Sequence, residues 1–147
     1  MSLSMTKDER EAFLTDLHVA VISITDEGRG PLAVPVWYSY KPGGEVHVTT
    51  EGSSRKARLL RQAGRFTLCV QQETHPYKYV SVEGPVVAIE PVDIERDMTP
   101  LVNRYLNPED ATEYLEGLDS AAGIVLVRMQ PERWYSEDYA KYGTEGN

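Results

Sequence analysis

Residues 66–89 read FTLCVQQETHPYKYVSVEGPVVAI and contain two runs that are typical of β-strands, 66–71 and 79–89. In the longer run, valines alternate with other residues, which predicts a strand with one buried face. Gly84 and Pro85 interrupt this alternation and predict a disturbed register at that point. We therefore expect both runs to belong to a β-sheet.

Further strand-like and helix-like runs lie on both sides of this stretch. Turn-forming residues separate the earlier strands, which indicates an antiparallel meander. The expected strands are 18–25, 32–40, 45–50, 66–71, 79–89 and 123–129, the last extendable to 135, and the expected helices are 6–17, 53–62, 93–105 and 108–117. Six strands with a few peripheral helices predict a mainly β protein built as a small, closed or partly closed antiparallel barrel.

Length and composition fit one globular domain. The chain has 147 residues, of which 41% are hydrophobic and 26% charged. We expect the domain at residues 6–138, after a leader or disordered N-terminus at 1–5 and before a C-terminal tail at 139–147. No apolar run approaches the ~18–20 residues that span a bilayer, and the polar start lacks a signal-peptide core.

Charge and cysteine content restrict the expected partners and compartment. The 23 acidic residues outnumber the 15 Lys and Arg, so the formal charge is −8. This charge argues against nonspecific binding to nucleic acid or to an anionic membrane. Cys69 is the single cysteine of the sequence, so no internal disulfide forms and a cytoplasmic protein is expected.

Residues 52–72 are the most informative segment, because they contain no acidic residue and a third of the cations. Ser53 or Ser54 is a natural N-cap for the helix that follows. The cations of this segment are Arg55, Lys56, Arg58, Arg61 and Arg65. Three of them fall in the first helical turn, where cations are unfavourable by a few tenths of a kcal/mol each. A bound phosphate would explain the placement, since free N–H groups, serine hydroxyls and basic side chains would converge on it.

Helical periodicity separates these cations. Lys56 shares a face with Leu60 and Ala63 and is expected to point toward the sheet, whereas Arg61 is expected to face water. The alternatives are a solvated basic face paired with acidic neighbours, as charge runs usually are, and a nucleic-acid patch, which the absence of interleaved aromatics disfavours.

The order of segments resembles the pyridoxamine 5′-phosphate oxidase-like superfamily. The residues that carry the resemblance are VTTEGSSRK at 48–56, a helix, a strand, and YVSVEGPV at 79–86. The resemblance covers about residues 18–135 and implies an antiparallel Greek-key split β-barrel that binds FMN or coenzyme F420. It also implies a homodimer with two cofactor sites at the interface, each built from both chains.

The resemblance implies particular cofactor-binding residues. Ser54, Arg55 and Lys56 match a triplet that grips the cofactor phosphate, and Thr50 matches a threonine at the end of the preceding strand. Lys56 and Arg58 equally match a Lys-x-Arg pattern that contacts the phosphates of F420. The strand with Pro35, Val36, Trp37 and Tyr38 is expected to lie along the isoalloxazine ring, with backbone amides between Val34 and Trp37 bonded to ring carbonyls.

The sequence departs from the pyridoxamine-phosphate oxidases proper. After Trp134 it has no Arg-Leu-His-Asp-like substrate motif, which argues against pyridoxamine phosphate as the substrate. Tyr79 stands where those oxidases have a glutamine that touches FMN. The extra cations Arg58 and Arg61 favour F420, and the Ser-Arg-Lys triplet favours FMN, so both cofactors remain candidates.

The remaining candidate residues have structural interpretations. His18, His47 and His75 follow no metal-ligand spacing, so no metal site is expected. Cys69 lies in an apolar strand, and buried packing is expected for it. Trp37, Tyr38 and Tyr40 are expected in the barrel core or the dimer interface, with an aromatic wall for a cofactor or substrate ring as the alternative.

The sequence thus predicts an oxidoreductase that uses FMN or F420 to transfer a hydride to or from a small unsaturated substrate. The catalytic residues stay unknown, because the cofactor carries the redox chemistry. The alternative is a non-catalytic binder of a flavin, haem or related anionic cofactor.

Overall fold

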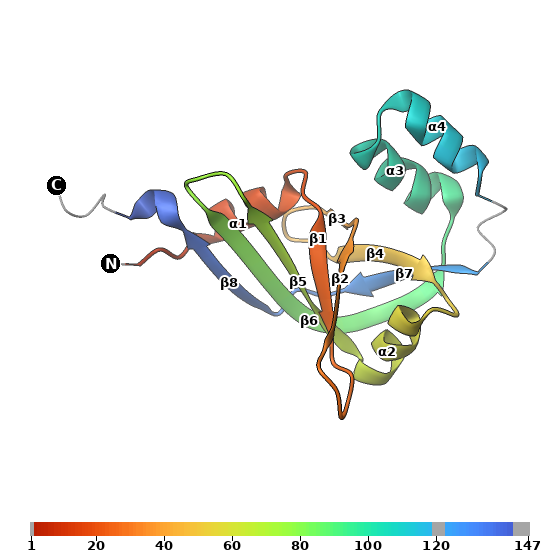
Figure 1. The fold of residues 1–147 in the computed structure, drawn as a ribbon, viewed down its shortest axis with the longest axis horizontal. Coiled ribbons are helices and arrows are strands. Elements are labelled where there is room, and N and C mark those ends of the chain that lie inside the picture. The colour runs from red at the N-terminus through yellow and green to blue at the C-terminus, as the bar shows by residue number, and fades with distance from the viewer. Residues whose placement is uncertain (1, 119–122, 143–147) are drawn as a thin grey trace.

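The computed structural model describes residues 2–118 and 123–142, which form a curled antiparallel sheet with helices around it (Figure 1). The helices are α1 (Lys7–Thr15), α2 (Arg55–Ala63), α3 (Thr99–Tyr105) and α4 (Pro108–Glu116), with a π-helical turn at Ile94–Met98 and a 3-10 turn at Tyr139–Lys141. The strands are β1 (Ala20–Ile24), β2 (Leu32–Val36), β3 (Ser39–Tyr40), β4 (Val46–Glu51), β5 (Arg65–Gln72), β6 (Lys78–Pro91), β7 (Ile124–Met129) and β8 (Arg133–Asp138).

The strands follow the order β2-β1-β5-β6-β7-β4-β3, and β8 also pairs with β6. The long strand β6 joins a first half-sheet, with β2, β1, β5 and β8, to a second half-sheet, with β7, β4 and β3. Its first part pairs with β5 and β8, and its last part pairs with β7. All pairs are antiparallel, so the prediction of a mainly β split barrel with flanking helices is confirmed.

Eight strands replace the six that were expected, because two predicted runs are divided. Residues 32–36 pair with β1, whereas Ser39 and Tyr40 turn to pair with β4. The last run breaks at residues 130–132, where Pro131 lies, and resumes as β8 beside the first part of β6.

The core lies inside the curled sheet and follows the period-two alternation of the strands. In β5 the side chains of Phe66, Leu68 and Val70 are buried, and their neighbours face outward. Helix α2 closes part of the barrel by burying Ala57, Leu59 and Leu60. The set of fully buried large side chains includes Tyr38, Leu14, Ile22, Ile24, Leu59, Leu60, Leu68 and Met129.

Gly84 lies where β6 bends between the two half-sheets. The connection from β7 to β8 crosses directly over it, with Gln130 N–H donating to the Pro85 carbonyl (3.0 Å) and Glu132 N–H donating to the Glu83 carbonyl (2.8 Å). A Cβ atom at position 84 would overlap the Gln130 carbonyl oxygen. The irregular register that Gly84 and Pro85 predict appears just beyond them, as a bulge between Val86 and Ala88.

Side-chain caps start the helices at the predicted places. Thr6 and Glu9 form the reciprocal capping box of α1, and Asn107 accepts a hydrogen bond from Asp110 N–H (2.8 Å) before α4. Asp93 caps the segment expected as the helix 93–105, which starts as a π-helical turn before α3 begins. In Figure 1, α3 and α4 stand apart from the barrel above β4 and β7.

The two ends of the described chain lie together along β8. Asp138 N–H donates to the Leu3 carbonyl (2.7 Å), and Met5 N–H donates to Ser136 Oγ (3.0 Å). The leader proposed at 1–5 therefore contacts the barrel from residue 3 onward, and the last five residues of the proposed tail, 143–147, are outside the described part. No helix among the described residues has the length and apolar character needed to cross a membrane.

Candidate functional site

The N-terminus of α2 begins at one of the two serines that the sequence offers as an N-cap. Ser54, not Ser53, is the N-cap, and its Oγ accepts a hydrogen bond from Ala57 N–H (3.1 Å). The same Oγ lies 3.0 Å from Thr50 Oγ1 at the end of β4. The N–H groups of Arg55 and Lys56, the first two residues of α2, have no intrahelical carbonyl to bond. The structure therefore brings together two hydroxyls and an open helix end.

Lys56 is a half-buried cation without a hydrogen bond or an ion pair among the described residues. Burial lowers the pKa of its ammonium group below the usual value, and no carboxylate offsets that cost. The side chain lies on the less exposed side of α2, as its spacing from Leu60 predicts. An anion beside Lys56 would restore the lost solvation.

The other cations of the segment differ in their partners. Arg55 Nη2 donates to Asp26 Oδ2 (2.5 Å), a carboxylate in the turn between β1 and β2, so this arginine is neutralised by its own chain. Arg58 is exposed and has no partner in the described part of the protein. Arg61 is exposed, as expected, and its Nη1 donates to the Gly52 carbonyl (2.8 Å).

The curled sheet has free edges along β2 and along the part of β4 that lies beyond its short pairing with β3. Strand β2 pairs on one side with β1, and β4 pairs along its length with β7 but with β3 at two residues alone. Backbone groups on the free sides of Val34–Trp37 and Val48–Glu51 are therefore left without a strand partner in the described sheet. Pro35, which has no N–H, fits such a strand edge.

The side chains of two predicted site residues are engaged elsewhere. Val36 is 8% exposed and belongs to the core, so its backbone alone is available to a ligand. The Trp37 ring stacks on Tyr105 of α3 at 4.9 Å with an interplanar angle of 1°, and it also meets Tyr114 of α4. Trp37 thus connects α3 and α4 to the barrel in the described chain.

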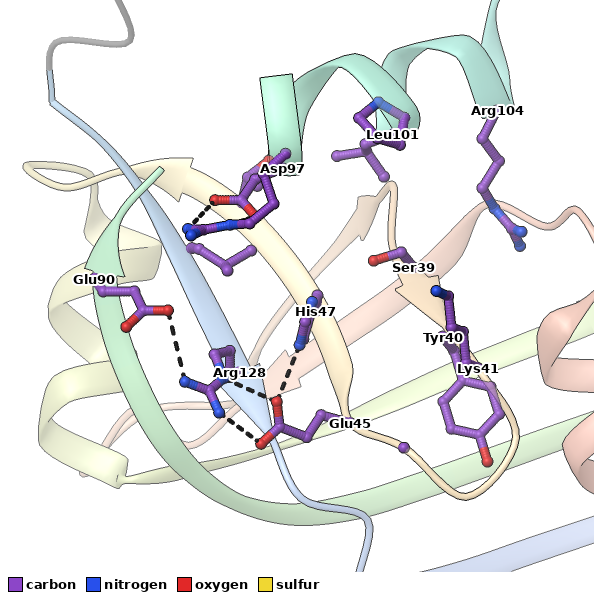
Figure 2. Close-up of a pocket in the computed structure, with 15 residues that line it drawn as sticks. Ser39, Tyr40, Lys41, Glu45, His47, Glu90, Asp97, Leu101, Arg104 and Arg128 are labelled. Atoms are coloured by element: carbon purple, nitrogen blue, oxygen red, sulfur yellow. Dashed lines mark hydrogen bonds and ion pairs between the residues drawn. The ribbon is translucent and has the colours of Figure 1, made fainter. Parts of the chain in front are cut away.

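Sequence reasoning missed a cavity of about 890 Å³ on the outer face of the second half-sheet, beneath α3 (Figure 2). Its floor includes His47, Thr49 and Arg128, and its cover includes Asp97 and Leu101. None of the predicted cofactor-binding residues lines it. The available signal was the alternation of Glu45, His47 and Thr49 with buried valines, which marks one polar face of β4.

An ion-pair network forms the floor of this cavity. Arg128 binds both oxygens of Glu45 (2.8 and 3.1 Å) and lies 3.6 Å from Glu90, as Figure 2 shows. His47 Nε2 lies 3.1 Å from the Glu45 carboxylate. The hydrogen bonds from Arg128 lower the pKa of Glu45 below its usual value.

The remaining histidines and the cysteine lie outside both the N-terminal end of α2 and the cavity beneath α3. His18 Nε2 bonds the Phe13 carbonyl (3.0 Å), and His75 packs edge-on against Tyr77. No three His, Cys, Asp or Glu side chains of the described residues gather as a metal site. Cys69 is half-buried on the outer face of β5, opposite Leu68 and Val70, so the expectation that it packs in the core was wrong. The strand alternation places it outside.

Comparisons with known proteins agree with this architecture. The family model described as pyridoxamine 5′-phosphate oxidase matches residues 6–138. A comparison with curated proteins gives no match for this chain.

Solved structures share the fold at low sequence identity. A conserved hypothetical protein from Mycobacterium tuberculosis is 22% identical, with 97% of this chain and 90% of that chain covered and a TM-score of 0.78. A protein described as F420 Reductase is 18% identical, with coverages of 85% and 94% and a TM-score of 0.64. The FAD and Heme binding protein from Mycobacterium smegmatis is 15% identical, with coverages of 93% and 73% and a TM-score of 0.68.

Proposed function

Because this chain belongs to the pyridoxamine 5′-phosphate oxidase family, we propose that it is an oxidoreductase that binds a phosphorylated flavin-type cofactor, FMN or coenzyme F420. It transfers a hydride to or from a small unsaturated substrate. The observation that carries the proposal is Lys56, a half-buried cation with no partner in the described chain, at an open helix N-terminus. A cofactor phosphate supplies the missing anion.

The residues around this helix end fit a phosphate. The free N–H groups of Arg55 and Lys56 and the Lys56 ammonium donate to its oxygens, and Arg58 adds a second cation nearby. Ser54 and Thr50 contribute hydroxyls that already lie 3.0 Å apart. The Arg55 guanidinium already pairs with Asp26, so it could contact the phosphate only while it also keeps this carboxylate partner. We therefore assign the main ion pair with the phosphate to Lys56.

The open edge of β2 orients the ring portion of the cofactor. Backbone groups between Val34 and Trp37 have no strand partner in the described sheet and bond the polar edge of the ring. When bound, the cofactor supplies the hydride acceptor or donor, so the chain itself needs only to bind and orient. Pyridoxamine phosphate is not expected as the substrate, since no Arg-Leu-His-Asp-like motif follows Trp134.

Titration of the cofactor-free protein with FMN and F420 in parallel tests the cofactor. We expect one of them to bind saturably with a Kd of about 1 μM or lower, because several charge-assisted hydrogen bonds form together. Bound FMN would absorb at about 450 nm and bound F420 at about 420 nm, because the cofactor itself sets the absorption. If neither binds at about 1 mM, the proposed cofactor class is wrong.

A non-catalytic cofactor binder is the second candidate function. One structural neighbour is described as an FAD and Heme binding protein, so the fold is compatible with cofactors of different chemistry. Turnover of enones and quinones by the protein loaded with reduced cofactor separates the two functions. Saturable cofactor binding with no turnover of any of these substrates would favour the binder.

We also propose that the protein is a homodimer with cofactor sites at the interface. A row of uncharged side chains crosses the outer face of the first half-sheet, with each residue directly opposite the next. The row is Pro35, Val21, Cys69, Ser81 and Tyr135. Val21 is 43% exposed and Tyr135 59% exposed, and the uncharged side chains of Cys69 and Ser81 lie between them in the row.

Val21→Lys is expected to separate the dimer, because a charge within the row would be buried without a partner. Light scattering should then give the mass of one chain in place of two. Val87→Lys is the matched control, since Val87 is also exposed but lies outside the row. A single-chain mass for the unmodified protein would contradict the proposal.

A further inference from the structure

The cavity beneath α3 has no role in the proposed function, and its charges are unevenly paired. Four cationic side chains and three carboxylates line it. Arg96 binds Asp97 through two contacts of 2.9 Å. Arg128 forms ion pairs with both Glu45 and Glu90. These pairs use all three carboxylates, and they leave Lys41 and Arg104 without an acidic partner among the described side chains.

Arg104 is held in place by contacts other than an ion pair. Its Nη2 donates to the Asp16 carbonyl (2.7 Å), and its guanidinium lies 5.3 Å from the centre of the Tyr38 ring and 5.6 Å from that of Tyr105. Its Nε is buried and has no hydrogen-bond partner. A buried donor without an acceptor costs free energy, and the contacts with Asp16, Tyr38 and Tyr105 fix the guanidinium at the edge of the cavity.

Apolar side chains from α3 and from β7 line part of the cavity. Leu101 is 5% exposed and Leu126 is 4% exposed, and Pro100 lies beside Leu101 at the start of α3. Figure 2 shows Leu101 and Arg104 descending from the same helix above Ser39 and Tyr40. A volume of about 890 Å³ is within the range of small-molecule sites.

We propose that the cavity beneath α3 is a second binding site, for a small organic carboxylate with an apolar body. The carboxylate binds Arg104 and Lys41, and the body packs against Leu101 and Leu126. Thr49 lines this cavity, whereas the next residue, Thr50, bonds Ser54 at the α2 site. Successive side chains of β4 point to opposite faces, so the two sites can be filled independently.

Calorimetric titration of the full chain without cofactor tests this site, with 3-phenylpropanoate and its neutral amide as probes. We expect saturable binding of the acid with a Kd of about 1 mM, as for fragment-sized ligands, and about tenfold weaker binding of the amide. Equal affinity for the acid and the amide, or no saturable binding of either, would overturn the proposal. Added FMN should leave the affinity for the acid unchanged, so failure here is distinct from failure of the cofactor proposal.

Variants locate the bound probe. Lys41→Gln should weaken binding of the acid about three- to tenfold, and Thr49→Phe should abolish it by filling the cavity. Lys7→Gln, an exposed cation on α1, is the matched control and should have no effect. Arg104→Gln should weaken binding most, but it also removes the contact with Asp16; if it does not fold, Lys41→Gln and Thr49→Phe decide. Unchanged binding in both of these variants would exclude the site.

Discussion

Gly84→Ala is expected to destabilise the fold by about 3–5 kcal/mol, because the new methyl group would overlap main-chain atoms that cannot easily move. A Cβ at this position would collide with the Gln130 carbonyl oxygen and would lie 2.9 Å from the carbonyl carbon. It would also lie 3.2 Å from Glu132 N, which donates to the Glu83 carbonyl. The substitution therefore pushes the β7–β8 connection away from β6.

Denaturation by urea measures this effect, with Gly30→Ala as the matched control. A Cβ at position 30 meets no atom within 4 Å, so that variant should remain within about 0.5 kcal/mol of the unmodified protein. A loss of 3–5 kcal/mol is a large part of the 5–15 kcal/mol that a domain of this size typically has. If Gly84→Ala costs less than about 1 kcal/mol, the close crossing at Gly84 does not govern stability.

Local sequence signals predicted the elements of the fold, and long-range contacts decided how they join. The valine alternation of residues 79–89 predicts β6, and Ser53 and Ser54 predict the start of α2. Gly84 and Pro85 predict an irregularity, but the segment that crosses Gly84 lies more than 40 residues further along the chain. The same limit explains the division of the run 32–40, whose last residues pair with β4 instead of β1.

The candidate cofactor site was predicted only in part, because local spacing predicts which side of a helix a residue lies on but does not predict long-range contacts. Helical spacing is local, so the inward position of Lys56 and the exposure of Arg61 followed from the sequence. The contact of Arg55 with Asp26 joins residues 29 positions apart, and no local pattern indicates it. The cavity beneath α3 gathers residues from strands and helices between positions 39 and 128, so its existence depends on the fold.

Lys56→Ala is expected to weaken binding of the cofactor by about 1.5–3 kcal/mol, or roughly 10- to 150-fold, if Lys56 makes a charge-assisted hydrogen bond to the phosphate. The cofactor-free protein should not lose stability. The substitution removes a half-buried cation that has no partner in the described chain, and it places a good helix former in the first turn of α2. Fluorescence titration and urea denaturation measure the two quantities separately.

Arg61→Ala is the control on the same helix. Arg61 is exposed and donates to the Gly52 carbonyl, so its loss should change the cofactor affinity less than about twofold. If Lys56→Ala lowers stability and leaves affinity unchanged, Lys56 has a structural role and the phosphate binds elsewhere.

The pH dependence of binding gives an independent check on Lys56. Burial lowers the pKa of its ammonium group in the cofactor-free protein, and a bound phosphate raises that pKa again. Affinity should therefore fall as the pH rises through the lowered pKa of Lys56. Lys56→Arg keeps its charge throughout this range and should remove the decline. A decline that persists in Lys56→Arg would assign the titration to another group.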